Sequence, residues 1–229
     1  MTNILVAGCL GSFVALSFMA SGATFFLGEV TQFIRSVVQS QPPSLGPYWN
    51  GSGFGFIVGC VFCYGSKVGW YHKIFLPVIL IEMEHGEASF WGSIDECALV
   101  LVSAGICAAN ILTSRSSIEV SRRGLLINLL CGDFIEVAYP FMEASSVVSL
   151  GGYIASGLAT EILYSSEARN VMSSAYIPIN LSIFLAKEWM SFAFAALTAF
   201  AVSFLGMVLQ NIMHKMWDGE TTKVGSKIN

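Results

Sequence analysis

Long apolar runs follow one another along this chain, separated by short polar stretches. The runs cover residues 4–28, 53–70, 97–112, 124–163 and 189–213. A helix needs roughly 20 apolar residues to cross a bilayer, so the fourth run is long enough for two spans. We divide this run near residues 145–152, where small residues cluster. The pattern therefore predicts an all-α membrane protein with six transmembrane helices.

Two further apolar segments are too short to cross a bilayer. They are "IFLPVILIEM" (residues 74–83) and "AYIPINLSIF" (residues 175–184), and each has a proline near its start. Proline suits the first turn of a helix, where its missing N–H has no partner to lose. We interpret residues 74–83 and 176–186 as two re-entrant half-helices, whose leading loops must be buried in protein or line a water-filled path. The alternative is a pair of helices that lie on the membrane surface.

The two halves of the chain resemble each other. With an offset of 101 residues Pro77 aligns with Pro178, and seven of 39 aligned positions are identical. Upstream, "SGFGFI" at 52–57 matches "SLGGYI" at 149–154. Each half then contains two spans, a half-helix and a third span. Because three spans is an odd number, the second half must enter the membrane from the opposite side, which is an inverted 3+3 repeat.

This organisation sets the expected boundaries of the chain. The first repeat covers residues 1–113, a loop covers 114–123, the second repeat covers 124–214, and a polar C-terminal tail covers 215–229.

Composition supports the membrane assignment. Hydrophobic residues make up 55% of the chain and charged residues only 11%, with a mean hydropathy of +0.69. Soluble domains average about 25% charged residues. The sequence shows no hydrolase, kinase or nucleotide motif, so we expect no enzyme activity, no cofactor and no nucleic-acid partner. The pair Cys60 and Cys63 is interpreted as apolar packing within a span rather than as a metal site.

The order of elements resembles that of the aquaporin family over about residues 5–214. "LPV" (76–78) and "IPI" (177–179) stand where that family has Asn-Pro-Ala, so both prolines match and both asparagines are missing. The sequence looks closest to the unorthodox superaquaporin branch, which tolerates altered motifs. The resemblance implies a multi-pass protein of the plasma membrane or the endoplasmic reticulum that forms a homo-oligomer, a tetramer if it follows the family.

The resemblance also implies a pore. Its midplane constriction would consist of Leu76, Pro77, Val78, Ile177, Pro178 and Ile179, and its selectivity filter of Phe56, Tyr164, Ser165 and Asn180. Leucine and isoleucine cannot donate the hydrogen bond that asparagine gives to a passing oxygen. What would remain is the positive potential of two opposed helix N-termini, which disfavours cations. We therefore expect a passive channel for water or small neutral solutes such as glycerol.

Acidic residues in the fourth run favour a different function. At about 100° per residue, Asp133, Glu136 and Glu143 share one face of the predicted fourth span, and ionisable residues inside a span usually face a cavity, a partner or a proton path. The alternative is a cation channel of the trimeric intracellular cation channel type, or a proton- or cation-coupled transporter of small solutes. For Asp133 a bond to the backbone of a re-entrant loop is the preferred interpretation.

Two loop regions complete the expectations. The sequon Asn50-Gly-Ser predicts a glycosylated external loop, with both chain termini in the cytosol. The acidic stretch that contains Glu82, Glu84, Glu87, Asp95 and Glu96 is interpreted as a solvated turn rather than a metal site. The basic loop at 114–123 is expected to be solvated and able to contact membrane lipid.

Overall fold

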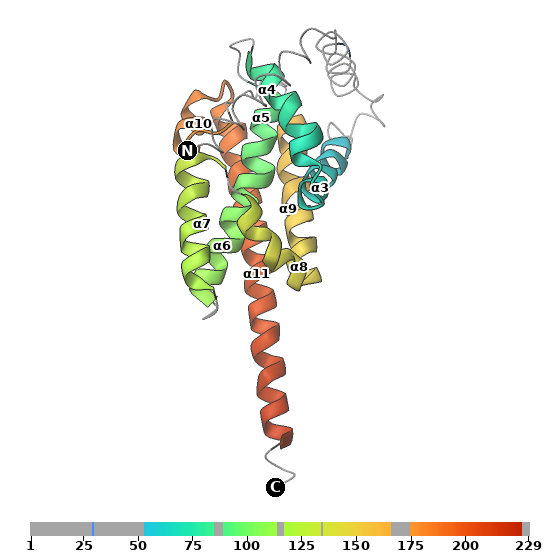
Figure 1. Cartoon of the computed structure of the whole chain (residues 1–229), viewed down its shortest axis with the longest axis vertical. Coiled ribbons are helices and arrows are strands. Elements are labelled where there is room, and N and C mark those ends of the chain that lie inside the picture. The colour runs from blue at the N-terminus through green and yellow to red at the C-terminus, as the bar shows by residue number, and fades with distance from the viewer. Residues whose placement is uncertain are drawn as a thin grey trace, which may run out of the picture. The chain divides into compact units, whose positions relative to one another are not determined.

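The computed structural model describes residues 53–84, 89–113, 117–133, 135–165 and 175–225, together with the single residue Glu29. All elements named below belong to one compact unit, residues 45–229 (Figure 1). In the described part every element is helical and no strand is present. The α-helices are α3 (Phe54–Lys67), α4 (Leu76–Glu84), α5 (Phe90–Ile94), α6 (Leu101–Thr113), α7 (Ile118–Cys131), α8 (Tyr139–Ala144), α9 (Ser146–Ser165), α10 (Ile179–Leu185) and α11 (Trp189–Gly225).

Three helical stretches are long and apolar enough to cross a membrane. They are Phe90–Thr113, Ser146–Ser165 and Trp189–Met216. The first is continuous through α5, the π-helical stretch η2 (Asp95–Val100) and α6. The third matches the predicted run at 189–213 and continues beyond it, as the long lower part of α11 in Figure 1. These helices agree with a membrane protein.

Two other predicted spans, residues 53–70 and 4–28, are not shown as full crossings. Helix α3 lies within the predicted span 53–70 and is apolar, but it has 14 residues, fewer than a full crossing requires. The predicted first span at 4–28 and the sequon at Asn50 lie outside the described residues. Six spans are therefore not shown.

The fourth apolar run is divided at two places. Helix α7 ends at Cys131, and the following Gly132 adopts a left-handed φ of 61° and donates its N–H to the Asn128 carbonyl. The chain then passes through the 3-10 turn η3 (Ile135–Ala138) and α8, and an extended Ser145 separates α8 from α9, which begins at Ser146. The helix thus breaks at the first residue of the predicted division at 145–152, whereas residues 146–152 form the first two turns of α9. The small residues there serve close helix packing instead, because Gly151 lies directly against Gly206 of α11.

Helix α9 packs between α3 and α11, and α6 packs between α11 and α7. Small residues allow these close approaches. Gly59 of α3 contacts the backbone of Ser156 on α9, and Gly105 of α6 contacts Phe200 and Ser203 on α11. A Cβ atom at either glycine would collide with the partner helix. Helices within lipid associate through van der Waals packing of this kind, because lipid removes the hydrophobic driving force for their association.

Helices α3 and α9 run antiparallel and contact each other reciprocally. The upstream match of the two halves has an offset of 97 residues (149 − 52), which pairs Gly59 with Ser156. These two equivalent residues meet, since the Ser156 hydroxyl donates to the Gly59 carbonyl over 2.7 Å. On one side of this contact the Cys60 thiol donates to the Tyr153 carbonyl. On the other side their equivalents at the same offset, Gly157 and Phe56, pack against each other. Reciprocal contacts of this kind are typical of two elements related by a twofold axis.

Helices α6 and α11 do not show the same relationship. Cys97 lies near Phe192, Gly105 near Ser203 and Thr113 near Asn211, so residue numbers rise together along both helices. Figure 1 shows both running downward. An inverted repeat predicts that these equivalent third spans run antiparallel, so the described structure does not show the inverted 3+3 repeat.

Candidate functional site

A pair of buried carboxyl groups lies inside the first described span. Asp95 is 2% exposed and Glu96 is 0% exposed. Their interpretation as part of a solvated turn was wrong. Ser89 caps the helix upstream, where its hydroxyl accepts the Gly92 N–H over 2.9 Å. The helix therefore begins at Phe90, and residues 91–94, which precede the two acids, are already buried.

The backbone geometry changes at the same position. Residues Asp95–Val100 form a π-helix between the α-helices α5 and α6. Such π-helical turns are rare and occur frequently at functional sites.

Three separate segments close around the Glu96 side chain. The first is its own helix, the second is Gly132 at the end of α7, and the third is Ile177 in the loop before α10. A Cβ atom on Gly132 would meet both Glu96 Oε1 and the Ile177 carbonyl oxygen. Only glycine fits there, on grounds of space and of its left-handed φ.

Glu96 lacks full hydrogen bonds. The Ile177 backbone N–H and the Ser182 hydroxyl face its carboxyl group. Within the described residues, however, neither Glu96 oxygen has a partner that meets hydrogen-bond geometry. A buried carboxyl group left in this state costs about 1–3 kcal/mol or more.

Asp95 faces a pair of tyrosines. The Tyr71 hydroxyl interacts with the Asp95 carboxyl group, and the Tyr71 and Tyr176 hydroxyls lie 2.6 Å apart. Both tyrosines lie outside the three candidate spans. Burial raises the pKa of each hydroxyl above its ordinary value, and the charge of Asp95 is the second-largest cause of the increase. Both therefore stay protonated and act as neutral donors beside the carboxyl group.

Two further acids face the pair from outside. Asp133 and Glu136 are exposed, and their negative charges act on Asp95. The structure thus brings four carboxyl groups into one region, two buried and two accessible. Within the described ranges no three His, Cys, Asp or Glu side chains form a group that could hold a metal ion.

Another carboxyl group in a span serves as a comparison. Glu161 of α9 accepts the Gly53 N–H over 3.2 Å and the Phe56 N–H over 2.9 Å. It thereby caps the N-terminus of α3, which has no side-chain cap of its own. The charge of Glu161 has an evident structural role, which Glu96 lacks.

The residues of the expected constriction lie on two elements with different neighbours. Leu76, Pro77 and Val78 begin α4, which packs on α5 and on the π-helical stretch η1 (Tyr71–Phe75). Ile177, Pro178 and Ile179 lead into α10, which packs on α7 and α11. The residues that meet are Tyr71 and Tyr176, which precede the two prolines. A constriction formed by the two proline segments stays a prediction.

The expected filter residues are also spread over several elements. Phe56 packs against Gly157 between α3 and α9. Tyr164 stacks edge-on with Phe54 and Phe90 near one end of the same pair, Ser165 is exposed at the end of α9, and Asn180 is exposed on α10.

The predicted common face of Asp133, Glu136 and Glu143 was wrong. That prediction assumed one continuous helix, but Asp133 lies in a non-helical link, Glu136 in a 3-10 turn and Glu143 in α8. Sequence reasoning missed Asp95 and Glu96 as site residues. A signal was present, because apolar residues flank them on both sides in "FWGSIDECALVL" and Ser89 precedes this stretch as a cap.

Comparison of the chain with protein-family models, with curated proteins and with solved structures finds no match in any of the three.

Proposed function

We propose that this protein is a membrane transport protein that moves a proton or a small monovalent cation by way of Asp95 and Glu96. The observation that carries the proposal is Glu96, a fully buried carboxyl group without a completed hydrogen bond in a membrane-spanning helix. Carboxyl groups at such positions usually belong to ion pathways or proton relays.

Energetics argue against a purely structural role for Glu96. A charged side chain costs about 3 kcal/mol at the centre of a spanning helix on insertion scales, and this value is an upper bound for Glu96, the seventh residue of its span (96 − 90 + 1). Glu161 offsets such a cost by binding two backbone N–H groups. The Ile177 N–H and the Ser182 hydroxyl face Glu96, but neither completes a hydrogen bond with it in the described residues. A bound cation or proton would supply the missing partner.

The neighbours of the pair suggest how a charge would move. Two carboxylates in a dry site repel each other strongly when both are charged, so the pair favours binding one proton or one monovalent cation. The exposed Asp133 and Glu136 can attract that cation toward Asp95. The Tyr71 and Tyr176 hydroxyls then continue the hydrogen-bonded path from Asp95 to the loop before α10. A divalent ion is a poorer fit, because within the described ranges no three His, Cys, Asp or Glu side chains form a group that could hold a metal ion.

The carboxyl groups and the two tyrosine hydroxyls therefore support the cation or proton transport alternative over the passive neutral-solute channel that the resemblance to aquaporins implies. The test is reconstitution of the full chain in liposomes that contain a pH-sensitive dye. With an imposed potential we expect proton or cation flux in the parent and a loss of about tenfold or more in Glu96→Gln, because removal of one charged contact commonly costs 1.4 kcal/mol or more. Glu188→Gln, an exposed glutamate in the turn before α11, is the control and should behave like the parent.

The same vesicles distinguish the rival function. Glycerol or water flux measured by osmotic shrinkage, unchanged by Glu96→Gln and without any ionic flux, would establish the passive channel and refute the proposal.

A further inference from the structure

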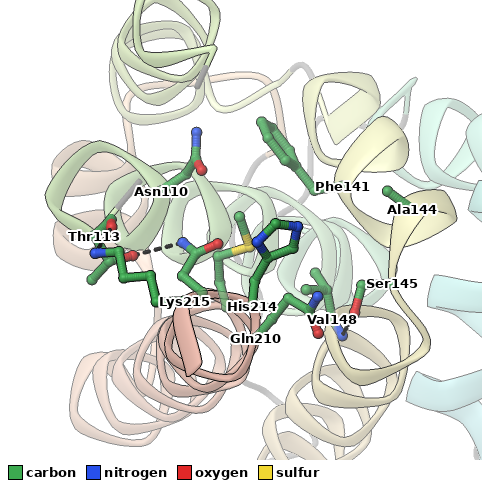
Figure 2. Close-up of a pocket in the computed structure, with 11 residues that line it drawn as sticks. Asn110, Thr113, Phe141, Ala144, Ser145, Val148, Gln210, His214 and Lys215 are labelled. Carbon is green, nitrogen blue, oxygen red and sulfur yellow. Dashed lines mark hydrogen bonds between the residues drawn. The ribbon is translucent and has the colours of Figure 1, made fainter. Parts of the chain in front are cut away.

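A cavity of about 550 Å³ lies where α6, α8, α9 and α11 meet, away from the carboxyl pair (Figure 2). Asn110 and Thr113 come from the end of α6, Ser145 precedes α9, and α11 contributes a polar row. This row consists of Gln210, Asn211, His214 and Lys215. The described residues that line the cavity include a lysine and a histidine and no carboxyl group.

The cavity lies at one end of all three candidate spans. Phe90–Thr113 ends at it, Ser146–Ser165 begins at it, and Trp189–Met216 ends at it. The lining residues Thr113, Ser145 and Lys215 therefore mark the level where the apolar stretches stop. This is the depth at which lipid phosphate groups lie, and where basic side chains from spanning helices reach the interface.

Hydrogen bonds hold the polar rim in place. The Lys215 ammonium donates to the Thr113 carbonyl over 2.7 Å, and the Asn211 amide donates to the Thr113 hydroxyl over 2.6 Å. One hydrogen bond uses only one of the three donors of a lysine, and the imidazole of His214 adds a ring N–H. Figure 2 shows His214 in the middle of the group, with Gln210 beside it.

The N-terminus of α9 adds to the positive potential. Helix α9 has 20 residues, and its first residue, Ser146, follows the cavity-lining Ser145. The N-terminal end of a helix carries a partial positive charge that favours anions. The C-terminus of α6 at Thr113 carries the opposite partial charge, and the Lys215 ammonium offsets it by donating to the Thr113 carbonyl. A lysine, a histidine and amide groups around a cavity that lacks acids together form an environment for an anion with several oxygen acceptors.

We propose that this cavity binds a phosphate group at the membrane surface, either the phosphodiester of an anionic lipid or a soluble phosphate. The lysine supplies charge, and Gln210, Asn211 and His214 supply directed polar contacts. This site is independent of the proposed ion transport, because it involves neither Asp95 nor Glu96.

The test measures retention of lipid by the full chain in native mass spectrometry. The probes are phosphatidylglycerol, zwitterionic phosphatidylcholine and inorganic phosphate. We expect the parent to retain phosphatidylglycerol in preference to phosphatidylcholine. A variant with both His214→Gln and Lys215→Gln should retain about tenfold less, since charge-assisted hydrogen bonds are the stronger ones. Lys187→Gln is the matched control, because Lys187 is exposed beyond the opposite end of α11.

A second variant separates the cavity from general surface charge. Gln210→Phe fills the cavity while it leaves both basic residues and the bond between Lys215 and Thr113 in place. It should also lose the preference for phosphatidylglycerol, and it decides the question if the double variant does not fold.

Inorganic phosphate identifies the source of the group. If it displaces the lipid, or binds when no lipid does, the natural ligand is a soluble phosphate; if it does neither, the ligand is the lipid. Equal retention of both lipids with no phosphate bound, or normal retention in Gln210→Phe, would overturn the proposal.

Discussion

The hydroxyl groups of Tyr71 and Tyr176 lie 2.6 Å apart and join the two segments that lead into α4 and α10. Tyr176 belongs to one of the two short proline segments that the sequence singles out, and Tyr71 lies three residues before the other (74 − 71). Because Tyr71 also contacts Asp95, the junction connects both segments to the buried carboxyl pair.

The tyrosine pair predicts how stability depends on pH. Burial raises the pKa of both hydroxyls in the folded protein above the unfolded value of about 10. Below that pH the folded protein and the unfolded chain both keep these protons, so the free energy of unfolding has its full value with respect to the two tyrosines. Above it the unfolded chain releases protons that the folded protein keeps, so stability falls as pH rises. Thermal unfolding in detergent between about pH 8 and 11 should show this decline.

A double variant assigns that decline. Tyr71→Phe combined with Tyr176→Phe should flatten the alkaline limb, because neither side chain can then release a proton. Equal slopes in the parent and in the double variant would show that the pair does not titrate as described.

Gly132 is predicted to tolerate no side chain. Its φ of 61° and its contacts with Glu96 and Ile177 leave no space for a Cβ atom. Gly132→Ala should lower the free energy of unfolding by about 2–4 kcal/mol, from left-handed strain and overpacking together. Gly69→Ala is a useful comparison, because Gly69 also has a positive φ of 88° but open space around its Cβ position. It should cost only the conformational strain, and chemical denaturation of the three proteins would measure the difference.

The directions of the three candidate spans predict which residues share a side of the membrane. Helices α6 and α11 run the same way and α9 runs against them. In a background without the six native cysteines, Thr113→Cys and Lys215→Cys should react with an impermeant thiol reagent from one side of sealed vesicles. Ser165→Cys should react only from the other side. Labelling of all three positions from the same side would contradict the arrangement of spans.

The sequence predicts well those elements that a local pattern determines. The span of α11 was located within three residues at its C-terminal end (213 against Met216), because an apolar run ends there at His214 and Lys215. The apolar run at 97–112 predicts that the span through α6 starts at Cys97, directly after Asp95 and Glu96. It starts at Phe90, and charged residues were a misleading marker because this pair is buried.

The site itself depends on contacts between distant segments. Glu96 is enclosed by Gly132, 36 residues away (132 − 96), and by Ile177, 81 residues away (177 − 96). No local periodicity encodes this closure. The same applies to residues 146–152, whose small side chains look like part of a break but form the start of α9, packed against Gly206.

The central claim is that Glu96 is present for ion transport and not for stability, and a comparison with Glu161 tests it most directly. Each residue is changed to methionine, and thermal stability and ion flux are measured on the same reconstituted samples. We predict that Glu96→Met abolishes flux and leaves the melting temperature unchanged or higher, because an apolar group of similar volume replaces an unsatisfied buried carboxyl group. Glu161→Met should lower the melting temperature, because the N–H groups of Gly53 and Phe56 lose their acceptor. A Glu96→Met protein that melts at a lower temperature while its flux is unchanged would contradict the account.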